Sequence, residues 1–379
     1  MTDSPTQSIS DFRREARSWL EANAPSEPMP EDGQPQREYI LAWQKRQAQG
    51  GWAGIAWPRE HGGRGLSVLE QIVWFEEYAR AGAPPTLNPS FVMLNHAGPT
   101  LIACGSDEQK AYHLPKILNG DVLWCQGFSE PGAGSDLGSL KCRGEVDGDD
   151  IVINGTKIWS SFADIAEWQE LLIRTDAKAS TSKALTWLIC PMDAPGITVR
   201  PIRTMAGPHK YCEVFYDNVR VPLANIVGGL NNGWATANAT LSFERGTAAL
   251  ALLIGLVLKV EKLLEDCPTS RPELRLRIAR LRAEGASIRA ANYRLALDSE
   301  NSVPDASGSM IRLSFAEFSQ RVSSAAIDLY GLAAPEVIGM HGWGHDYLDA
   351  FSETIAGGTA EIQRNIIGER VLGLPRGPR

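Results

Sequence analysis

The sequence predicts an α+β protein in which a helical segment, a β-rich segment and a second helical segment follow one another. Apolar residues recur at helical spacing from Phe12 to Leu20, and helical patterns continue to about Asp121. From Val122 to about Ile226 the chain consists of short stretches rich in β-branched and aromatic residues, separated by D-G, N-G and P-G turn signals. From Trp234 onward long apolar-periodic stretches return, and we expect them to pack together as a bundle.

Composition and charge restrict the class of protein. The chain has 379 residues, enough for two or three domains, and its 43% hydrophobic content is ordinary for a soluble globular protein. Its net charge of −8 argues against broad nucleic-acid binding. The longest apolar run, AALALLIGLVL, is too short to span a bilayer, and the polar N-terminus lacks the apolar core of a signal peptide. Six cysteines without a C-x-x-C pair favour reduced thiols, so we expect a cytoplasmic protein. From the net charge and the short apolar runs, we expect that it binds neither nucleic acid nor membrane.

Two short motifs resemble known binding sites but lack the required context. The glycines of SEPGAGSDLGSL come close to a dinucleotide fingerprint, yet the segment leads into a β-hairpin pattern and does not open a helix, so we reject a Rossmann site. His341 and His345 in HGWGH have the spacing of zinc ligands on a helix, but two glycines stand between them and no third ligand is evident. We expect no metal site.

Two glycines, Gly357 and Gly358, precede a predicted helix start in SETIAGGTAEIQR. Thr359 is a candidate N-cap, and Glu361 places a carboxylate in the first turn, where the helix dipole favours it. The glycines permit two interpretations. They form a flexible turn into a C-terminal helix, or they allow backbone N–H donors to approach an anionic atom.

Glu244 and a row of regularly spaced arginines can each be interpreted in two ways. Glu244 is the last acid before a long apolar helical run, where a carboxylate either pairs with a cation or has its pKa raised by desolvation, as a general base requires. Its neighbour Arg245 lies on a different face of the helix and need not be its partner. Arg275, Arg282 and Arg289 recur every seven residues, either as a solvated helix face or as a phosphate-binding surface.

Several runs, taken together, resemble the acyl-CoA dehydrogenase family of FAD-dependent flavoproteins over nearly the whole chain. The runs that carry the resemblance are, in order, GWAGIAWPREHGGRG, SDEQKAYHLPKILNGDVLWCQGFSEPGAGSDLGSL, NGTKIWSS, GPHKYCEVFYDNVRVP and GGTAEIQRNIIGERVLG. The resemblance implies a helical N-terminal domain (residues 1–121), a middle β-barrel (122–231) and a C-terminal four-helix bundle (232–379). It also implies a lipid-metabolising oxidoreductase that takes an acyl-CoA to the 2,3-enoyl-CoA and passes electrons to an electron-transfer flavoprotein.

The resemblance assigns roles around FAD, the implied cofactor. It implies that Gln126, Phe128 and Ser129 contact the flavin ring and that Trp159 and Ser161 flank the N5 side of that ring. There the substrate's β-hydrogen arrives as hydride while a carboxylate removes the α-proton.

The remaining implied roles concern the substrate and the FAD nucleotide. Ser135 in GAGSD resembles a contact to the acyl-CoA, and Arg245 is placed with it in the substrate site. Thr359 and Glu361 resemble the segment that meets the nucleotide portion of FAD. Gly357 corresponds to the backbone N–H that stabilises the thioester oxygen as negative charge develops.

The sequence departs from the commonest family pattern at two places. Many relatives carry the catalytic glutamate directly before G-T, where this chain has Gly357, and a second branch carries it within an L-x-x-E-R run. Leu241, Glu244 and Arg245 match that run, so we predict Glu244 as the base. An R-x-x-F-G element that meets FAD pyrophosphate is absent, and Arg271 or Arg275 is the candidate substitute.

The resemblance therefore leaves more than one possibility for the assembly and for the reaction type. The resemblance implies a homotetramer, or a heterotetramer in which a paired subunit completes the site. The alternative functions are a flavin oxidase or monooxygenase of the same superfamily, and one subunit of a heteromeric acyl-CoA dehydrogenase.

Overall fold

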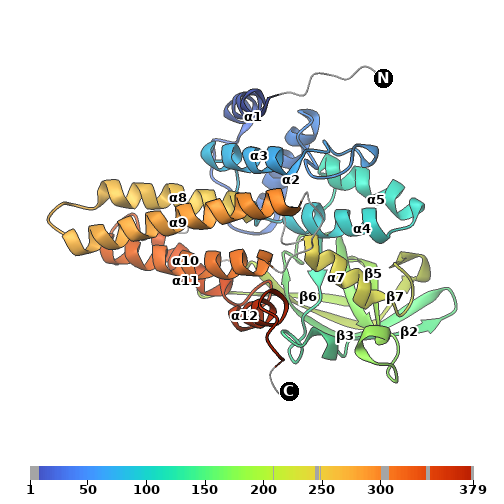
Figure 1. The fold of residues 1–379 in the computed structure, drawn as a ribbon. Helices are drawn as coiled ribbons and strands as arrows, with labels where there is room; N and C mark the ends of the chain where they lie inside the picture. Colours follow the sequence, from blue (N-terminus) through green and yellow to red (C-terminus); the bar gives the residue numbers. More distant parts are fainter. Residues whose placement is uncertain are drawn as a thin grey trace.

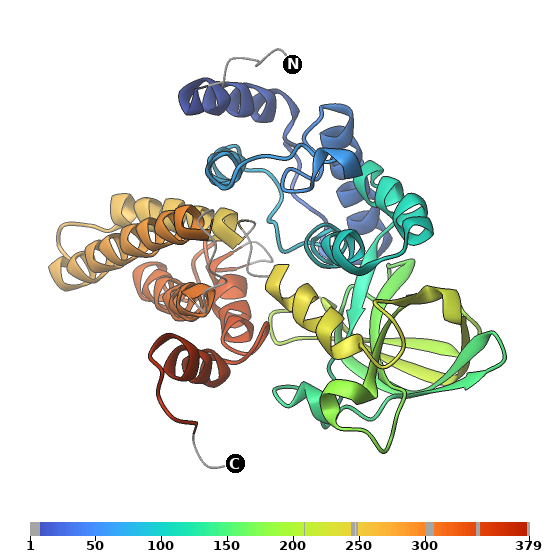
Figure 2. The ribbon, with the colours of Figure 1, turned by 45° about the vertical axis from the view of Figure 1, so that its right-hand side comes forward.

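The chain folds into a helical N-terminal part, a β-rich middle domain and a helical C-terminal domain, which confirms the predicted fold class (Figure 1). The computed structural model describes residues 8–207, 209–243, 247, 249–299, 307–338 and 342–376. The three parts meet around the middle of the molecule, with the β-rich domain and the long helices on opposite sides (Figure 2).

The N-terminal part contains five α-helices within its described residues, of which two begin at a complete capping box. Ser67 and Glu70 cap the third helix, and Ser106 and Gln109 cap the fifth, so side chains satisfy backbone groups that a helix start leaves unpaired. The five helices are α1 (Ile9–Asn23), α2 (Gly33–Gln49), α3 (Val68–Arg80), α4 (Gly98–Cys104) and α5 (Asp107–Asn119).

The middle domain is a curved sheet in which β3 pairs with β7 and β2, β7 with β6, β4 with β1 and β5, and β5 with β8. Its apolar positions alternate with exposed ones along β3 and β7, which places one face of each strand in the core. The described strands are β1 (Trp124–Gly127), β2 (Arg143–Asp147), β3 (Asp150–Ser161), β4 (Trp168–Arg174), β5 (Leu185–Pro191), β6 (Ile197–Ile202), β7 (Tyr211–Pro222) and β8 (Ile226–Val227). A short helix, α6 (Thr181–Ala184), lies between β4 and β5.

Among the described residues, six α-helices follow the sheet, and α8, α9, α10 and α11 pack together as the long bundle. Figure 2 shows α7 lying against the β-rich domain, apart from the bundle. Close packing explains this position, because a side chain at Gly233 would collide with the backbone of Thr186 and Trp187 in β5. The six helices are α7 (Gly233–Phe243), α8 (Ala249–Asp266), α9 (Pro272–Ser299), α10 (Ser307–Tyr330), α11 (Trp343–Glu353) and α12 (Ala360–Ile366).

The buried carboxylate of Glu76 joins the N-terminal helices to the bundle. It lies on α3 and accepts hydrogen bonds from Arg13 of α1 at 2.9 Å and from Nε of Arg289 of α9 at 2.7 Å. Burial alone would raise the pKa of Glu76, but hydrogen bonds from Tyr293, Arg289 and Arg13 outweigh it and hold the pKa below its ordinary value near 4.5. One carboxylate thus fixes three helices relative to one another.

The spaced arginines of α9 bind other parts of the chain. Arg275 donates to the carbonyls of Leu264 and Cys267 at the end of α8, and Arg282 pairs with Glu261. With Arg289 paired to Glu76, each arginine of the row has a partner within the chain. The row therefore serves helix packing, and a phosphate would have to displace these partners.

The six cysteines are free thiols, in accord with the reduced state expected from the sequence. Burial raises the pKa of Cys142 to about 11, and the Cys212 thiol is shifted in the same direction by its own burial. Within the described residues, no helix is long and apolar enough to cross a membrane.

We predict that Glu76→Gln lowers the free energy of unfolding at pH 7 by roughly 2–4 kcal/mol, because Arg289 and Arg13 both lose their ion pair with Glu76 and Arg13 keeps only its pair with Glu77. Since the folded pKa of Glu76 is depressed, its contribution is present above about pH 4.5 and is lost as the pH falls through the folded value. Urea unfolding between pH 3 and pH 7 should therefore show a flatter profile for Glu76→Gln than for the wild type. Glu38→Gln, on the exposed face of α2, is the control; equal profiles for all three proteins would contradict the assignment.

Candidate active site

Strand β1 places Gln126, a predicted flavin contact, beside two buried polar side chains. The amide nitrogen of Gln126 lies 2.8 Å from Oε1 of Glu170 and 3.3 Å from Nδ1 of His96, and His96 lies 3.2 Å from the same carboxylate oxygen. Glu170 and His96 are buried, and Phe128 belongs to the apolar core. Sequence analysis missed His96 and Glu170, which come from η2 (Met93–Ala97) and β4.

A buried ion pair holds the next residues of this segment onto the sheet. Lys157 of β3 has no exposed surface, and its Nζ donates to Oε1 of Glu130 and to the carbonyl of Phe128, both at 2.9 Å. Burial lowers the pKa of Lys157, while the Glu130 carboxylate opposes that shift. Glu130 also accepts from the backbone N–H groups of Lys141 at 2.6 Å and Cys142 at 2.8 Å.

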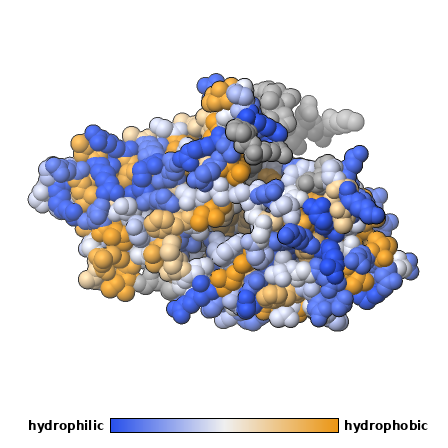
Figure 3. All heavy atoms as spheres, turned by 90° about the horizontal axis from the view of Figure 1, so that it is seen from below, coloured by the Kyte–Doolittle hydropathy of each residue, from blue (hydrophilic) through white to orange (hydrophobic). Residues whose placement is uncertain are grey.

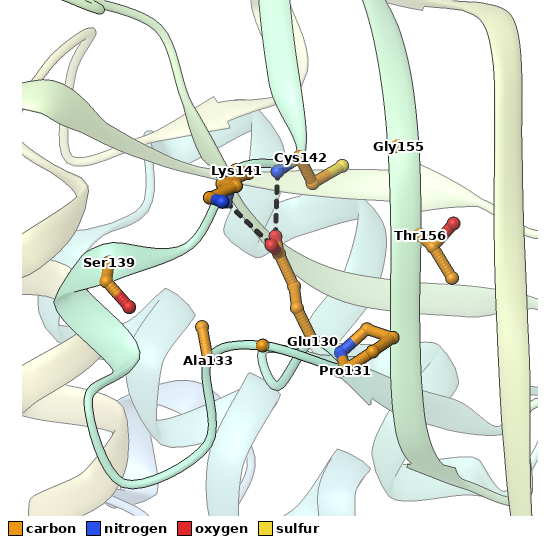
Figure 4. Close-up of a pocket in the computed structure, with 9 residues that line it drawn as sticks. Glu130, Pro131, Ala133, Ser139, Lys141, Cys142, Gly155 and Thr156 are labelled. Carbon is orange, nitrogen blue, oxygen red and sulfur yellow. Dashed lines mark hydrogen bonds between the residues drawn. The ribbon is translucent and has the colours of Figure 1, made fainter.

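Figure 4 shows the Glu130 side chain reaching across a pocket toward Lys141 and Cys142. The pocket has a volume of about 260 Å³ and lies between the SEPGAGS loop and β3, with Ser139, Gly155 and Thr156 among its lining residues. Ser135 lies exposed in the same loop. The ion pair therefore fixes one wall of the pocket, and the loop that lines the pocket also carries the predicted acyl-CoA contact.

Trp159 is held in an unusual conformation at the end of β3. The register between β3 and β7 shifts between Lys157 and Ser160, and within this bulge Trp159 adopts φ +63° and leaves 56% of its surface exposed. Its ring packs edge-on against Tyr211, with the centroids 6.0 Å apart. A left-handed backbone at a bulky residue costs about 1–3 kcal/mol, so the surrounding sheet must hold it.

The predicted flavin contacts on the two strands are neighbours. The N–H of Ile158 donates to the carbonyl of Ser129 at 2.9 Å, which brings Ser129 beside Trp159. Ser161 pairs with Tyr211 in the sheet. The structure thus brings Ser129, Trp159 and Ser161 together at one edge of the β-rich domain.

The double-glycine turn precedes α12, with the predicted cap in place. Thr359 accepts a hydrogen bond from the N–H of Ile362 at 3.3 Å, so it is the N-cap. A backbone hydrogen bond and a hydrogen bond from Thr359 lower the pKa of exposed Glu361. Gly357 and Gly358 adopt φ +64° and +90°, values that residues with a Cβ rarely adopt.

The carbonyl and N–H groups of this turn differ in their partners. The carbonyl of Ala356 accepts from Arg312 at 3.1 Å, and the carbonyls of Gly357 and Gly358 accept from Gln363 at 2.9 and 3.2 Å. In contrast, no partner for the N–H groups of Gly357 and Gly358 is found among the described residues. The turn therefore presents exposed backbone donors, as a site for developing negative charge requires.

Contacts between the sheet and α11 bring this turn to the side of the molecule that carries Trp159. Lys210, directly before β7, places Nζ 3.8 Å from Asp349 of α11, and its carbonyl accepts from the N–H of Phe162. Arg312 pairs with Glu353 at the end of α11 at 2.6 Å and also holds the turn that follows. Seen from below, the molecule is hollowed near its middle, and apolar atoms lie in and beside the hollow (Figure 3).

Three residues named from the sequence lie outside the described part of the chain. They are Glu244, Arg245 and His341. On either side of the first two, α7 ends at Phe243 and Thr247 donates to Oε1 of Gln71 at 2.7 Å. The roles predicted for Glu244 and Arg245 remain predictions. No group of three or more potential metal ligands occurs among the residues that the structure describes.

Arg271 and Arg275, the candidate pyrophosphate ligands, both bind the ends of neighbouring helices. Arg271 donates to the carbonyls of Asp328 and Leu329, at 2.9 and 3.1 Å, at the end of α10. In the same way, Arg275 donates to the carbonyl of Cys267 at the end of α8. These bonds satisfy carbonyls that a helix end leaves free. The geometry therefore gives neither arginine a free guanidinium for a phosphate.

Comparison with protein families matches all three parts of the chain. The acyl-CoA dehydrogenase N-terminal domain matches residues 6–121, the middle domain residues 125–219 and the C-terminal domain residues 231–372.

Similar proteins and structures cover nearly the whole chain. Acyl-CoA dehydrogenase IpdE1 of Mycobacterium tuberculosis is 38% identical over 98% of this chain and 99% of its own length, and FadE26 of the same organism is 34% identical over 87% and 86%. The solved structure described as the Tcur3481-Tcur3483 steroid ACAD superposes with a TM-score of 0.86 at 31% identity, covering 100% of both chains. The ChsE4-ChsE5 complex from Mycobacterium tuberculosis superposes with a TM-score of 0.81 at 31% identity, again over 100% of both chains.

We predict that Lys157→Met lowers the free energy of unfolding by about 3–5 kcal/mol, because the Glu130 carboxylate stays buried without its cation. The double variant Lys157→Met with Glu130→Gln should lose less than the sum of the single changes, since no buried charge then remains. Urea unfolding of the four proteins measures this coupling. Strictly additive losses would show that the two side chains act independently.

Proposed function

The chain belongs to the acyl-CoA dehydrogenase family, an oxidoreductase family, and we propose that it oxidises an acyl-CoA thioester to the 2,3-enoyl-CoA with FAD as its cofactor. In this proposal Glu244 removes the α-proton, and the double-glycine turn stabilises the thioester oxygen. The observation that supports it most directly is the turn itself, whose exposed N–H groups are free of protein partners among the described residues.

The residues at the edge of the β-rich domain fit a flat heteroaromatic cofactor. The half-exposed indole of Trp159, held by its bulge, offers a planar apolar face. Ser129 lies next to it through the bond to Ile158, and Ser161 follows two residues later on the same strand. Gln126 adds an amide fixed by Glu170. When bound, FAD would supply the acceptor for the substrate's β-hydride.

Proton removal depends on two groups of this chain. A carboxylate at Glu244, at the start of an apolar helical run, would take the α-proton, and desolvation would raise its pKa toward the working range of a base. As the proton leaves, negative charge develops on the thioester oxygen. The N–H of Gly357, which no side chain shields, is the proposed donor to that oxygen.

We assign the remaining predicted contacts by position. Ser135 lies exposed on the loop that lines the 260 Å³ pocket and would contact the acyl-CoA, and Arg245, next to Glu244 in the sequence, is the second proposed substrate contact. Thr359 and Glu361, at the start of α12, would meet the nucleotide portion of FAD. An electron-transfer flavoprotein remains the proposed electron acceptor.

Two features support assembly with a second acyl-CoA dehydrogenase subunit. Large apolar side chains are exposed on α11, the glycine turn and the C-terminal segment, and an exposed apolar surface of this kind is typical of an interface. These residues are Phe351, Ile355, Leu372 and Leu374. The related steroid ACAD and ChsE4-ChsE5 structures are named for pairs of proteins, which favours a bulky acyl group and a paired subunit here too.

We predict that the chain expressed alone forms an assembly larger than one chain, and that combining Ile355→Glu with Leu372→Glu reduces it to a monomer, because two charges then enter an apolar contact. Light scattering during size-exclusion chromatography measures the mass. Leu276→Glu, at an exposed leucine of α9, is the matched control. A folded, FAD-binding wild type that is monomeric would contradict an interface between copies, and FAD binding that appears only on co-expression with a related chain would assign the surface to a different subunit.

We predict that Glu244→Gln keeps FAD but slows flavin reduction by roughly 10²–10⁴-fold, because glutamine cannot accept the α-proton. Anaerobic stopped-flow mixing with a panel of straight, branched and steroid-derived acyl-CoAs measures the rate and identifies the substrate class. Glu265→Gln, an exposed carboxylate of α8, is the control. A wild type that no acyl-CoA reduces would refute the proposed activity, whereas wild-type reduction by Glu244→Gln would refute the assigned base alone.

A further inference from the structure

The two glycines of the turn have no conformational preference of their own that would fix their peptide groups. Gly357 and Gly358 both lie at positive φ, and neither carries a Cβ that would restrict rotation. Both are exposed, so core packing does not hold them either. The direction of their N–H groups must therefore be set from outside the turn.

Because the peptide bond is planar, the direction of each carbonyl in the turn determines the direction of the N–H that follows it. In a trans peptide the C=O of one residue points opposite to the N–H of the next. A hydrogen bond that holds the Ala356 carbonyl thus sets the N–H of Gly357, and one that holds the Gly357 carbonyl sets the N–H of Gly358. Arg312 makes the first bond at 3.1 Å, and Gln363 makes the second at 2.9 Å.

The Gln363 side chain is built for this contact. It is 1% exposed, and its Nε2 donates to two successive carbonyls, those of Gly357 and Gly358. The reverse amide orientation would place its oxygen against both carbonyls, so the assignment follows from the contacts. Its Oε1 is buried and has no hydrogen-bond partner among the described residues. The side chain thus leaves one of its own polar atoms unsatisfied while it holds two carbonyls of the turn.

We propose that Gln363 and Arg312 are positioning residues that set the direction of the N–H groups of Gly357 and Gly358 toward the thioester oxygen. The inference rests on the proposed function, because it assigns those N–H groups to the oxyanion. It adds two residues that act through the backbone carbonyls of the turn.

The test isolates the deprotonation step. An acyl-CoA in which sulfur replaces the β-carbon keeps its α-protons but has no β-hydride, so its α-protons can exchange with D₂O while the flavin stays oxidised. Gln363→Met has nearly the same volume but no donor, and we expect it to slow this exchange about 10- to 100-fold, because a misdirected donor loses much of its stabilisation. The dissociation constant of the analogue, the FAD content and the melting temperature should change little.

A second readout needs neither substrate nor turnover. Hydrogen–deuterium exchange of the backbone, measured by mass spectrometry on a peptide spanning residues 353–364, should be faster in Gln363→Met than in the wild type. Gln320→Met is the matched control, since Gln320 binds the same region at the carbonyl of Ala350 and the hydroxyl of Thr354 but touches no glycine carbonyl. It should leave the α-proton exchange rate within about 3-fold of the wild type.

The outcomes separate the inference from the proposed function. If Gln363→Met exchanges α-protons at the wild-type rate, or slows no more than Gln320→Met does, the positioning role is wrong. If Gln363→Met does not fold, Arg312→Lys makes the same test, because lysine keeps the charge beside Glu353 but lacks the fork that reaches Ala356; an unchanged exchange rate there overturns the proposal. If the wild type itself exchanges no α-proton, the proposed function fails and this inference fails with it.

Discussion

The carboxylate of Glu130 is the contact on which the candidate site depends. It accepts from the Lys157 ammonium and from two backbone N–H groups, and both charged side chains are buried. Burying such charges costs several kcal/mol for each ion unless every hydrogen-bonding position is used. Because Lys157 also holds the carbonyl of Phe128, the cost is offset only when the SEPGAGS loop lies in one position on β3.

The same requirement organises the rest of the molecule. Glu76 is satisfied only when α1, α3 and α9 come together, and Oε1 of Glu170 is contacted by groups from η2 and β1. Each buried acid is thus shared between elements that are far apart in sequence. The apolar core supplies the driving force for compaction, but it tolerates small shifts, whereas a charged hydrogen bond does not. We infer that these carboxylates fix the relative positions of the three parts of the chain.

The sequence predicted the order of elements because the underlying signals are local. Helical periodicity, turn residues and the cap at Thr359 each depend on a few neighbouring residues, and the structure contains the elements they indicate. Lys157 could have been found in the same way, since alternation along β3 places it on the buried face, where a lysine needs a partner. That partner, Glu130, is 27 residues away and could not be identified from spacing.

Long-range pairs around the site could not be predicted for the same reason. Arg312 reaches the glycine turn across 44 residues and His96 reaches Glu170 across 74, and neither spacing corresponds to a motif. The bulge that gives Trp159 its positive φ depends on the register between two strands, which no residue of NGTKIWSS specifies alone. Glu244 and Arg245 lie outside the described residues, so their assignment rests on the family pattern.

The glycine at position 357 has a structural consequence beyond removing a carboxylate from the turn. A residue with a Cβ would confine its own φ and so restrict the peptide on either side, but glycine gives up that restriction. With Gly358 next to it, two consecutive residues at positive φ would leave three peptide groups free to rotate. Three carbonyls, those of Ala356, Gly357 and Gly358, are the ones that side chains hold. In the proposed mechanism, the tethers from α10 and α12 replace the stiffness that the two glycines lack, so that the turn presents its N–H groups in a fixed direction.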